Sequence, residues 1–183
     1  MSTTSPTAAS DTRSPFRHLP DTARLWTFGV SRPLEPGEES RLLGVVDRFL
    51  EGWKAHGHPL AAAREWRYGR FLLVAVNDRV TAPSGCSIDA LIRELKGLEK
   101  ELGVEMVGGS PVWFREGGPG GEIRRLSRPA FKAAAEAGKV TPNTVAFDLS
   151  LTRLAELRAG KWELPAGRSW HARYLGKGTG TSA

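Results

Sequence analysis

Six consecutive apolar residues, Phe71 to Val76, constrain this fold more than any other stretch of the sequence. Because successive side chains of a β-strand point to opposite faces, a run that is apolar on both alternations indicates a strand buried on both faces. Such a strand needs a layer of protein on each side. We therefore expect residues 66–76 to contribute the central strand of a sheet whose two faces are both covered.

Two longer segments, 38–56 and 88–102, carry the apolar stripe of a helix that packs on a sheet, because their apolar residues recur every three or four positions. Strands are predicted at 24–30, 104–107, 112–115, 122–126 and 140–147, and shorter helices after Ser127 and over 151–159. This order predicts the α+β class, with a mixed β-sheet covered by two amphipathic helices and followed by a smaller β-β-α-β unit.

Shifts in composition divide the chain into segments. We expect a disordered N-terminal tail over 1–22, because that stretch is rich in Ser, Thr, Ala and Pro. An α+β core should follow over 23–110. The smaller β-β-α-β unit, with a Trp-rich C-terminal arm, should span 111–175 and pack on that core. Residues 176–183 are rich in glycine and are predicted to form a flexible tail.

The formal net charge of +6, from 26 basic and 20 acidic residues, gathers near the C-terminus. Residues 158–183 carry five basic residues and one acidic residue, whereas 25–157 is close to neutral. A surface that neutralises phosphates needs basic charge along the folded body, so no nucleic-acid partner is expected. A single cysteine, the lack of an apolar stretch of about 18 residues and the lack of a signal peptide predict a cytoplasmic protein without membrane insertion.

The segment Ser84 to Asp89, with the sequence SGCSID, contains the first candidate for chemistry. Cys86 falls at a predicted helix N-terminus, where free N–H groups and the helix dipole stabilise a thiolate. With His171 as base and Asp89 as orienting carboxylate, Cys86 would form a nucleophilic centre of a thiol-dependent enzyme or redox protein. The alternative is that Cys86 is a small buried hydrophobe and that Asp89 only complements the helix dipole.

The same loop suggests an anion site made by Ser84, Gly85 and Ser87, since hydroxyl and backbone N–H groups before a helix bind anions. No lysine of the chain is followed by Ser or Thr, so ATP hydrolysis by a P-loop mechanism is not supported. His56 and His58 lie two residues apart, but no third ligand is identifiable and no HExxH or paired CxxC motif occurs. We therefore predict no metal and no cofactor.

Tryptophan and arginine provide a second candidate site. Residues 162–175 hold two tryptophans, one histidine and one tyrosine among interleaved arginines. Such rings can stack on a planar or cationic ligand, a peptide or a base. The candidate binding residues are Trp26, Trp113, Trp162, Trp170 and Arg173. The alternative is that this arm packs on the sheet and uses its tryptophans as a lid over the core.

The chain resembles a group of small uncharacterised bacterial proteins that are often labelled automatically as ABC transporter ATPases. The resemblance covers about residues 24–175 and is carried by Trp26 with Arg32-Pro33, by Trp53 to Gly57, by Thr144 to Phe147, and above all by SGCSID at 84–89 and SWHAR at 169–173. It implies a shared fold, and it would place a functional site at the last two motifs.

Residues 112–165 are also similar to GYF-type adaptor domains. The similar features are Trp113-Phe114, the glycine-rich turn after it, the helix through Phe131, the segment Ala137 to Phe147, and Trp162. This resemblance implies an aromatic surface that holds proline-rich peptides. Together these patterns favour a non-enzymatic binding or adaptor protein whose partner is a peptide, a protein or a small metabolite. The thiol-dependent enzyme or redox protein is the alternative.

Overall fold

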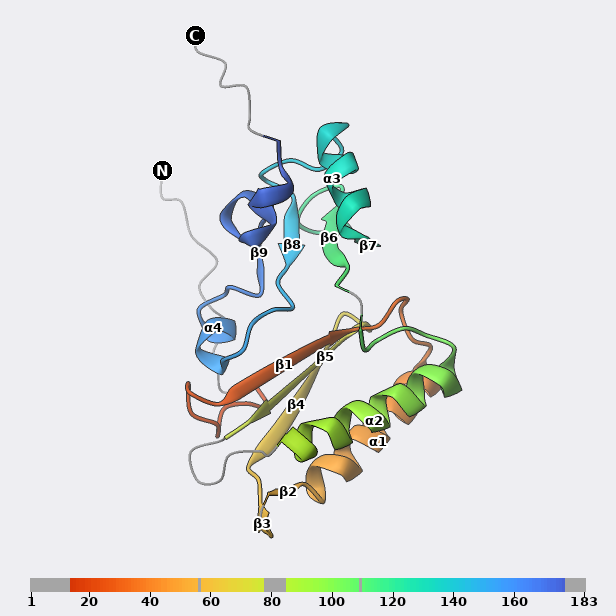
Figure 1. Ribbon diagram of the computed structural model, residues 1–183, viewed down its shortest axis with the longest axis vertical. Helices are drawn as coiled ribbons and strands as arrows, with labels where there is room; N and C mark the ends of the chain where they lie inside the picture. Colours follow the sequence, from red (N-terminus) through yellow and green to blue (C-terminus); the bar gives the residue numbers. More distant parts are fainter. Residues whose placement is uncertain (1–13, 56, 78–84, 109, 177–183) are drawn as a thin grey trace.

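The computed structural model describes residues 14–55, 57–77, 85–108 and 110–176 of the 183-residue chain. Its two larger β-sheets stand one above the other, with two long helices beside the lower sheet (Figure 1). The predicted α+β class is confirmed. The prediction of a mixed sheet is wrong, because every strand pair within the described ranges is antiparallel.

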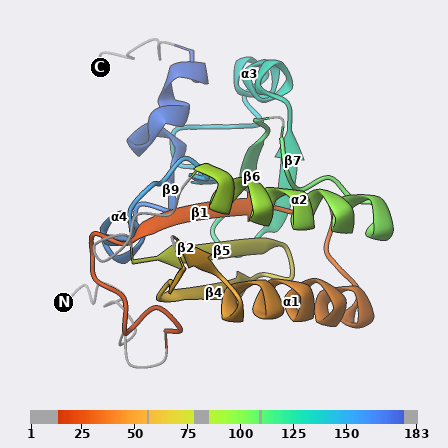
Figure 2. The ribbon, with the colours of Figure 1, turned by 60° about the horizontal axis from the view of Figure 1, so that its bottom comes forward.

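The lower sheet has the strand order β1-β5-β4. Its strands are β1 (Arg24–Gly29), β4 (Ala62–Arg67) and β5 (Phe71–Val76). All six residues of β5 are buried, so the prediction of a central strand covered on both faces is confirmed. Leu72, Val74 and Val76 face the helices α1 (Pro36–Glu51) and α2 (Gly85–Leu102), which lie side by side on one face of the sheet (Figure 1, Figure 2).

The upper sheet has the strand order β7-β6-β8-β9. Its strands are β6 (Val112–Glu116), β7 (Glu122–Leu126), β8 (Val145–Phe147) and β9 (Glu163–Pro165). Helix α3 (Arg128–Glu136) begins after Ser127, whose side chain accepts a hydrogen bond from the backbone N–H of Ala130, and α4 (Leu154–Arg158) precedes β9. The predicted β-β-α-β unit is present, and β9 extends its sheet within the segment that was predicted as an arm.

The two sheets share one buried core, which occupies the face of β5 turned away from α1 and α2. Phe71 lies at its centre, with its ring centroid 4.9 Å from Phe147 and 5.2 Å from both Trp113 and Trp162. Aromatic contacts at these separations add to the free energy of burying the rings. The second layer over β5 is therefore the upper sheet itself.

Residues 14–22 contradict the predicted disordered tail in the part that the structure describes. Phe16 is 1% exposed and Leu19 is 7% exposed, and both pack in the core shared by the sheets. Their carbonyl oxygens accept hydrogen bonds from the Arg158 side chain at 3.0 and 3.1 Å. The prediction failed because the Ser, Thr, Ala and Pro content of the stretch does not reveal that two of its apolar residues are buried in the core.

Several elements also differ from prediction in their bounds. The helix predicted over 38–56 ends at Glu51, and a short hairpin of β2 (Lys54–Ala55) and β3 (His58–Pro59) follows it. The strand predicted within 66–76 is a hairpin of β4 and β5, turned by Tyr68 and Gly69 with φ of 56° and 60°, as in a type I′ turn.

No strand forms at 104–107, because the backbone N–H groups of Met106 and Val107 donate to the Glu99 carboxylate instead of to a sheet. The strand predicted over 140–147 is shortened to β8, since Thr141 and Thr144 close a turn before it. Within the described ranges, no helix is both long enough and apolar enough to cross a membrane.

Candidate functional site

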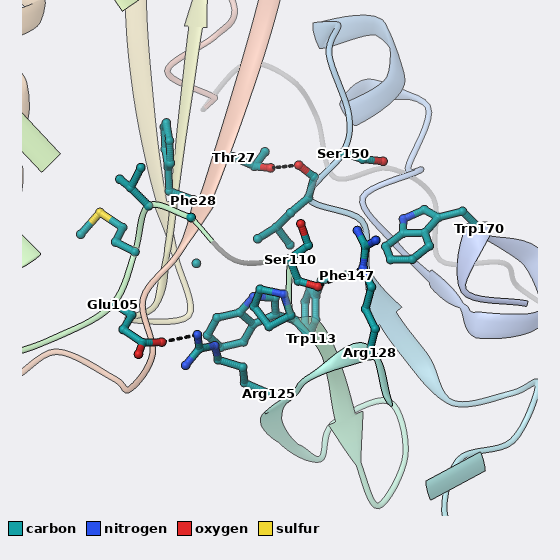
Figure 3. Close-up of a pocket in the computed structure, with 16 residues that line it drawn as sticks. Thr27, Phe28, Glu105, Ser110, Trp113, Arg125, Arg128, Phe147, Ser150 and Trp170 are labelled. Atoms are coloured by element: carbon teal, nitrogen blue, oxygen red, sulfur yellow. Dashed lines mark hydrogen bonds and ion pairs between the residues drawn. The ribbon is translucent and has the colours of Figure 1, made fainter. Parts of the chain in front are cut away.

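A pocket of about 270 Å³ opens where the outer edge of β1 meets the upper sheet (Figure 3). Its volume lies just below the roughly 300–1,000 Å³ of typical ligand sites. Residues from β1, β6 and β7, from the start of α3 and from the segments that follow α2 and β8 all reach it. Its polar lining residues are Thr27, Glu105, Ser110, Arg125, Arg128 and Ser150.

Trp113 forms the floor of the pocket and depends on a glycine below it. The ring is 1% exposed and lies against the backbone of Gly29 in β1. A Cβ atom at residue 29 would approach the ring to 2.7 Å, closer than packing allows, so only glycine admits the ring there. The guanidinium groups of Arg70 and Arg125 lie 5.6 and 5.8 Å from its ring centroid.

Trp170 forms the opposite wall and is only half-buried. It belongs to the short helix η3 (Trp170–Tyr174), and its indole N–H donates to Asp148 Oδ1 at 2.9 Å. The Ser150 hydroxyl donates to the same carboxylate oxygen at 2.5 Å, and the Thr27 hydroxyl donates to the Leu149 carbonyl at 2.8 Å. These hydrogen bonds hold the wall and the segment after β8 in place.

The two arginines that line the pocket differ in their partners. The Arg125 guanidinium forms an ion pair with Glu105, which also lines the pocket (Figure 3). Arg128 is exposed at the first position of α3, its Nε–H donates to the Ser110 carbonyl at 3.2 Å, and its guanidinium lies 5.4 Å from the Trp170 ring centroid. No carboxylate in the described part of the chain forms an ion pair with Arg128. It therefore faces the pocket without an ion-pair partner among the described residues.

The structure brings two of the four predicted tryptophans to the pocket and leaves the other two elsewhere. Trp113 and Trp170 line it. Trp162 is 2% exposed in the shared core, stacked on Tyr68. Trp26 lies on the helix-covered face of the lower sheet, 6.4 Å from Trp53 between ring centroids. The exposed Arg173 lies over Trp170 at 5.4 Å but does not line the pocket.

His171, the predicted base, is fully buried beside Phe131 and Trp170. Burial lowers the pKa of its imidazole to about 4, so the ring is neutral near pH 7. Its Nδ1 lies 2.7 Å from the Ser169 hydroxyl, which in turn lies 3.3 Å from the Ala166 carbonyl. Nδ1–H therefore donates to Ser169, and Nε2 is left as a buried acceptor with no partner among the described residues.

The other residues of the predicted thiol centre are placed only in part. Asp89 is exposed on α2, and no described hydrogen bond or ion pair joins it to His171, which packs beside α3. Ser84 and the side chains of Cys86 and Ser87 lie outside what the structure describes, and Gly85 is described only as the first residue of α2, so the nucleophile and the anion loop stay predictions. Where residues are described, no cluster of three or more His, Cys, Asp or Glu is arranged to hold a metal ion.

Sequence reasoning missed Ser110, Arg125, Arg128 and the part of β1 that lines the pocket. Arg128 directly follows the predicted cap residue Ser127 and lies close in sequence to the hairpin that contains Trp113 and Phe114. This position is the one local signal that points to Arg128. Comparison of the chain with protein-family models, with curated proteins and with solved structures finds no match. The bacterial and GYF-type resemblances accordingly stay predictions.

Proposed function

We propose that the protein is a non-enzymatic binding protein and that the pocket between β1 and the upper sheet takes a ligand through a carboxylate group. The observation that carries this proposal is Arg128, which faces the pocket without an ion-pair partner among the described residues while its neighbour Arg125 is paired with Glu105. A planar guanidinium binds a carboxylate through two parallel hydrogen bonds, which fits this ligand group.

The surroundings of Arg128 support binding of a carboxylate. The Trp170 ring and the Ser110 carbonyl hold the guanidinium at the pocket from two sides, so less side-chain freedom is lost when a ligand arrives. The Ser110 side chain lines the same pocket and offers a hydroxyl group to a second carboxylate oxygen or to a polar neighbour. Trp113 supplies an apolar floor for the part of the ligand next to its carboxylate.

A ligand-observed titration tests this proposal. Binding of 4-fluorobenzoate is measured by the broadening of its ¹⁹F NMR signal, with neutral 4-fluorobenzamide as the probe that lacks the charge. We expect the wild-type chain to bind the benzoate and to bind the benzamide at least about tenfold more weakly, since a charge-assisted bidentate pair is lost.

Two variants with the same change of charge make the titration specific to the pocket. Arg128→Gln should abolish the preference for the benzoate, whereas Arg93→Gln, which changes an exposed arginine of α2, should preserve it. Equal binding of benzoate and benzamide by the wild-type chain, or equal losses in both variants, would overturn the proposal.

A further inference from the structure

The outer edge of β1 is paired at both of its ends, and between them no described residue pairs with it. At one end the Leu25 N–H donates to the Thr152 carbonyl at 2.9 Å. At the other end, just past the strand, the Ser31 N–H donates to the Glu105 carbonyl at 2.8 Å. Alternate residues of a strand direct their N–H and C=O groups to the same edge. Thr27 and Gly29 therefore direct these groups outward too, between the two closed ends.

This open stretch faces the pocket. Thr27 and Gly29 both line it, and because glycine has no side chain, the lining atoms of Gly29 belong to the backbone. No described residue supplies a backbone hydrogen bond to their outward N–H groups. Unpaired edges invite the addition of another strand, and proteins usually cover or blunt them. Here this edge and Arg128 line one and the same pocket.

The length of the open stretch limits what can pair with it. A strand that ran past both ends would displace the contacts of Thr152 and Glu105, whereas the end of a chain would stop between them.

The charges decide which end of a chain fits. An amino terminus would need a carboxylate, but Glu105 is paired with Arg125, and Asp148 accepts hydrogen bonds from Trp170 and Ser150. Arg128 is the lining cation without an ion-pair partner among the described residues. A carboxyl terminus is therefore the complementary one.

We propose that the pocket binds the carboxyl-terminal residues of a peptide in extended conformation, paired to the edge of β1 at Thr27 and Gly29, with the terminal carboxylate on Arg128. This inference rests on the proposed function and names its ligand class. Main-chain hydrogen bonds supply affinity in strand addition, and the carboxylate supplies the choice of a chain end over an internal segment.

Short synthetic peptides test this inference in the full chain. The probe is acetyl-trialanine with a free carboxylate, compared with its carboxamide, with acetate, and with two versions that carry an N-methyl group on the last or the second-last peptide nitrogen. Affinities come from ¹H–¹⁵N NMR titrations, and hydrogen exchange of the Thr27 and Gly29 amides reports on pairing directly.

We expect the peptide to bind at least about tenfold more tightly than acetate and to lose about fivefold for each edge hydrogen bond that N-methylation removes. The carboxamide and Arg128→Gln should each abolish the gain over acetate, and the peptide should slow exchange of the Thr27 and Gly29 amides.

If carboxylate probes bind but the peptide is no tighter than acetate, or if neither N-methyl group matters, strand pairing is wrong and the proposed function survives. If no carboxylate probe binds, both fail.

Discussion

The contact between the two sheets is closed at one end and open at the other, although both ends are built from tryptophan and arginine. At the closed end Trp162 stacks on Tyr68, and the Arg115 Nε lies 2.5 Å from a Glu163 carboxylate oxygen. At the open end Arg128 lies over Trp170, and no described carboxylate pairs with it. The same residue types therefore complete a core in one place and leave a charged pocket in the other.

This difference shows that an arginine beside a tryptophan indicates a binding site only where no carboxylate of the protein pairs with the arginine. At the closed end the Arg115 side chain is 10% exposed and its charge is met by Glu163, so no ligand is needed. At the open end no described carboxylate pairs with the Arg128 guanidinium, so a ligand can supply the partner. Four expected results, taken from the largest effect to the smallest, would sharpen this contrast or break it.

Truncating the closed end should cost the most stability. Trp162→Ala removes a buried ring that contacts Phe71, Phe147 and Tyr68, and we expect the free energy of unfolding to fall by about 3–5 kcal/mol. Trp170→Ala, at the half-buried wall of the pocket, should cost roughly 1–2 kcal/mol. Denaturant unfolding measures both. A Trp170 variant as unstable as the Trp162 variant would mean that Trp170 is a core lid and would contradict the contrast.

Acid should lower the free energy of unfolding through His171. This buried residue stacks on Trp170 at the open end, with ring centroids 3.9 Å apart. In the unfolded chain this imidazole takes up a proton below its ordinary pKa of 6.5, whereas in the folded protein burial lowers the pKa to about 4. The unfolded state binds more protons in this interval, so stability should be complete above pH 6.5 and fall by up to about 3 kcal/mol as the pH drops toward 4.

Unfolding free energies measured between pH 7 and pH 4 test this dependence. His171→Asn should flatten the profile in that interval, because Asn cannot take up the proton. His18→Asn, the same change at an exposed histidine, is the matched control. An unchanged slope in the His171 variant would show that other groups cause the acid loss.

Breaking the ion pair at the closed end should have an intermediate effect. Glu163→Gln leaves the Arg115 guanidinium largely buried without a charged partner and weakens the acceptor of the Tyr68 hydroxyl, so we expect a loss of about 2 kcal/mol. Glu101→Gln, which breaks the exposed pair with Arg41, is the matched control and should cost under about 0.5 kcal/mol. Thermal and denaturant unfolding measure the loss of stability in both variants. Equal losses would show that the Arg115–Glu163 pair contributes no more to stability than the exposed Arg41–Glu101 pair.

The smallest effect on stability is expected at the open end. Arg128→Gln should change the free energy of unfolding by less than about 0.5 kcal/mol, because the guanidinium is exposed and leaves no described carboxylate unpaired. The same variant should lose carboxylate binding. Denaturant unfolding beside the ¹⁹F titration measures the two properties together. A large loss of stability would show that Arg128 is part of the core, as Arg115 is.

The sequence predicts the layers of this protein better than its pocket. The run Phe71 to Val76 and the two amphipathic stripes predict a covered central strand, because local periodicity records which faces are buried. The sequence predicts Trp113, Trp162 and Trp170 alike as ligand-binding residues. Which of them line the pocket and which is buried in the core depends on how the two sheets pack together. The opening at Gly29 depends on where distant segments stop pairing with β1, and no local pattern encodes that.

One measurement tests the central claim, that the open end binds ligand and the closed end does not. The chain has six tryptophans, and each gives an indole N–H signal in a ¹H–¹⁵N NMR spectrum, assigned with Trp113→Phe, Trp162→Phe and Trp170→Phe. During titration with benzoate, the signals of Trp113 and Trp170 should move progressively while that of Trp162 stays in place. Movement of the Trp162 signal as large as that of Trp170, or no movement of either pocket signal at saturating benzoate, would contradict the account.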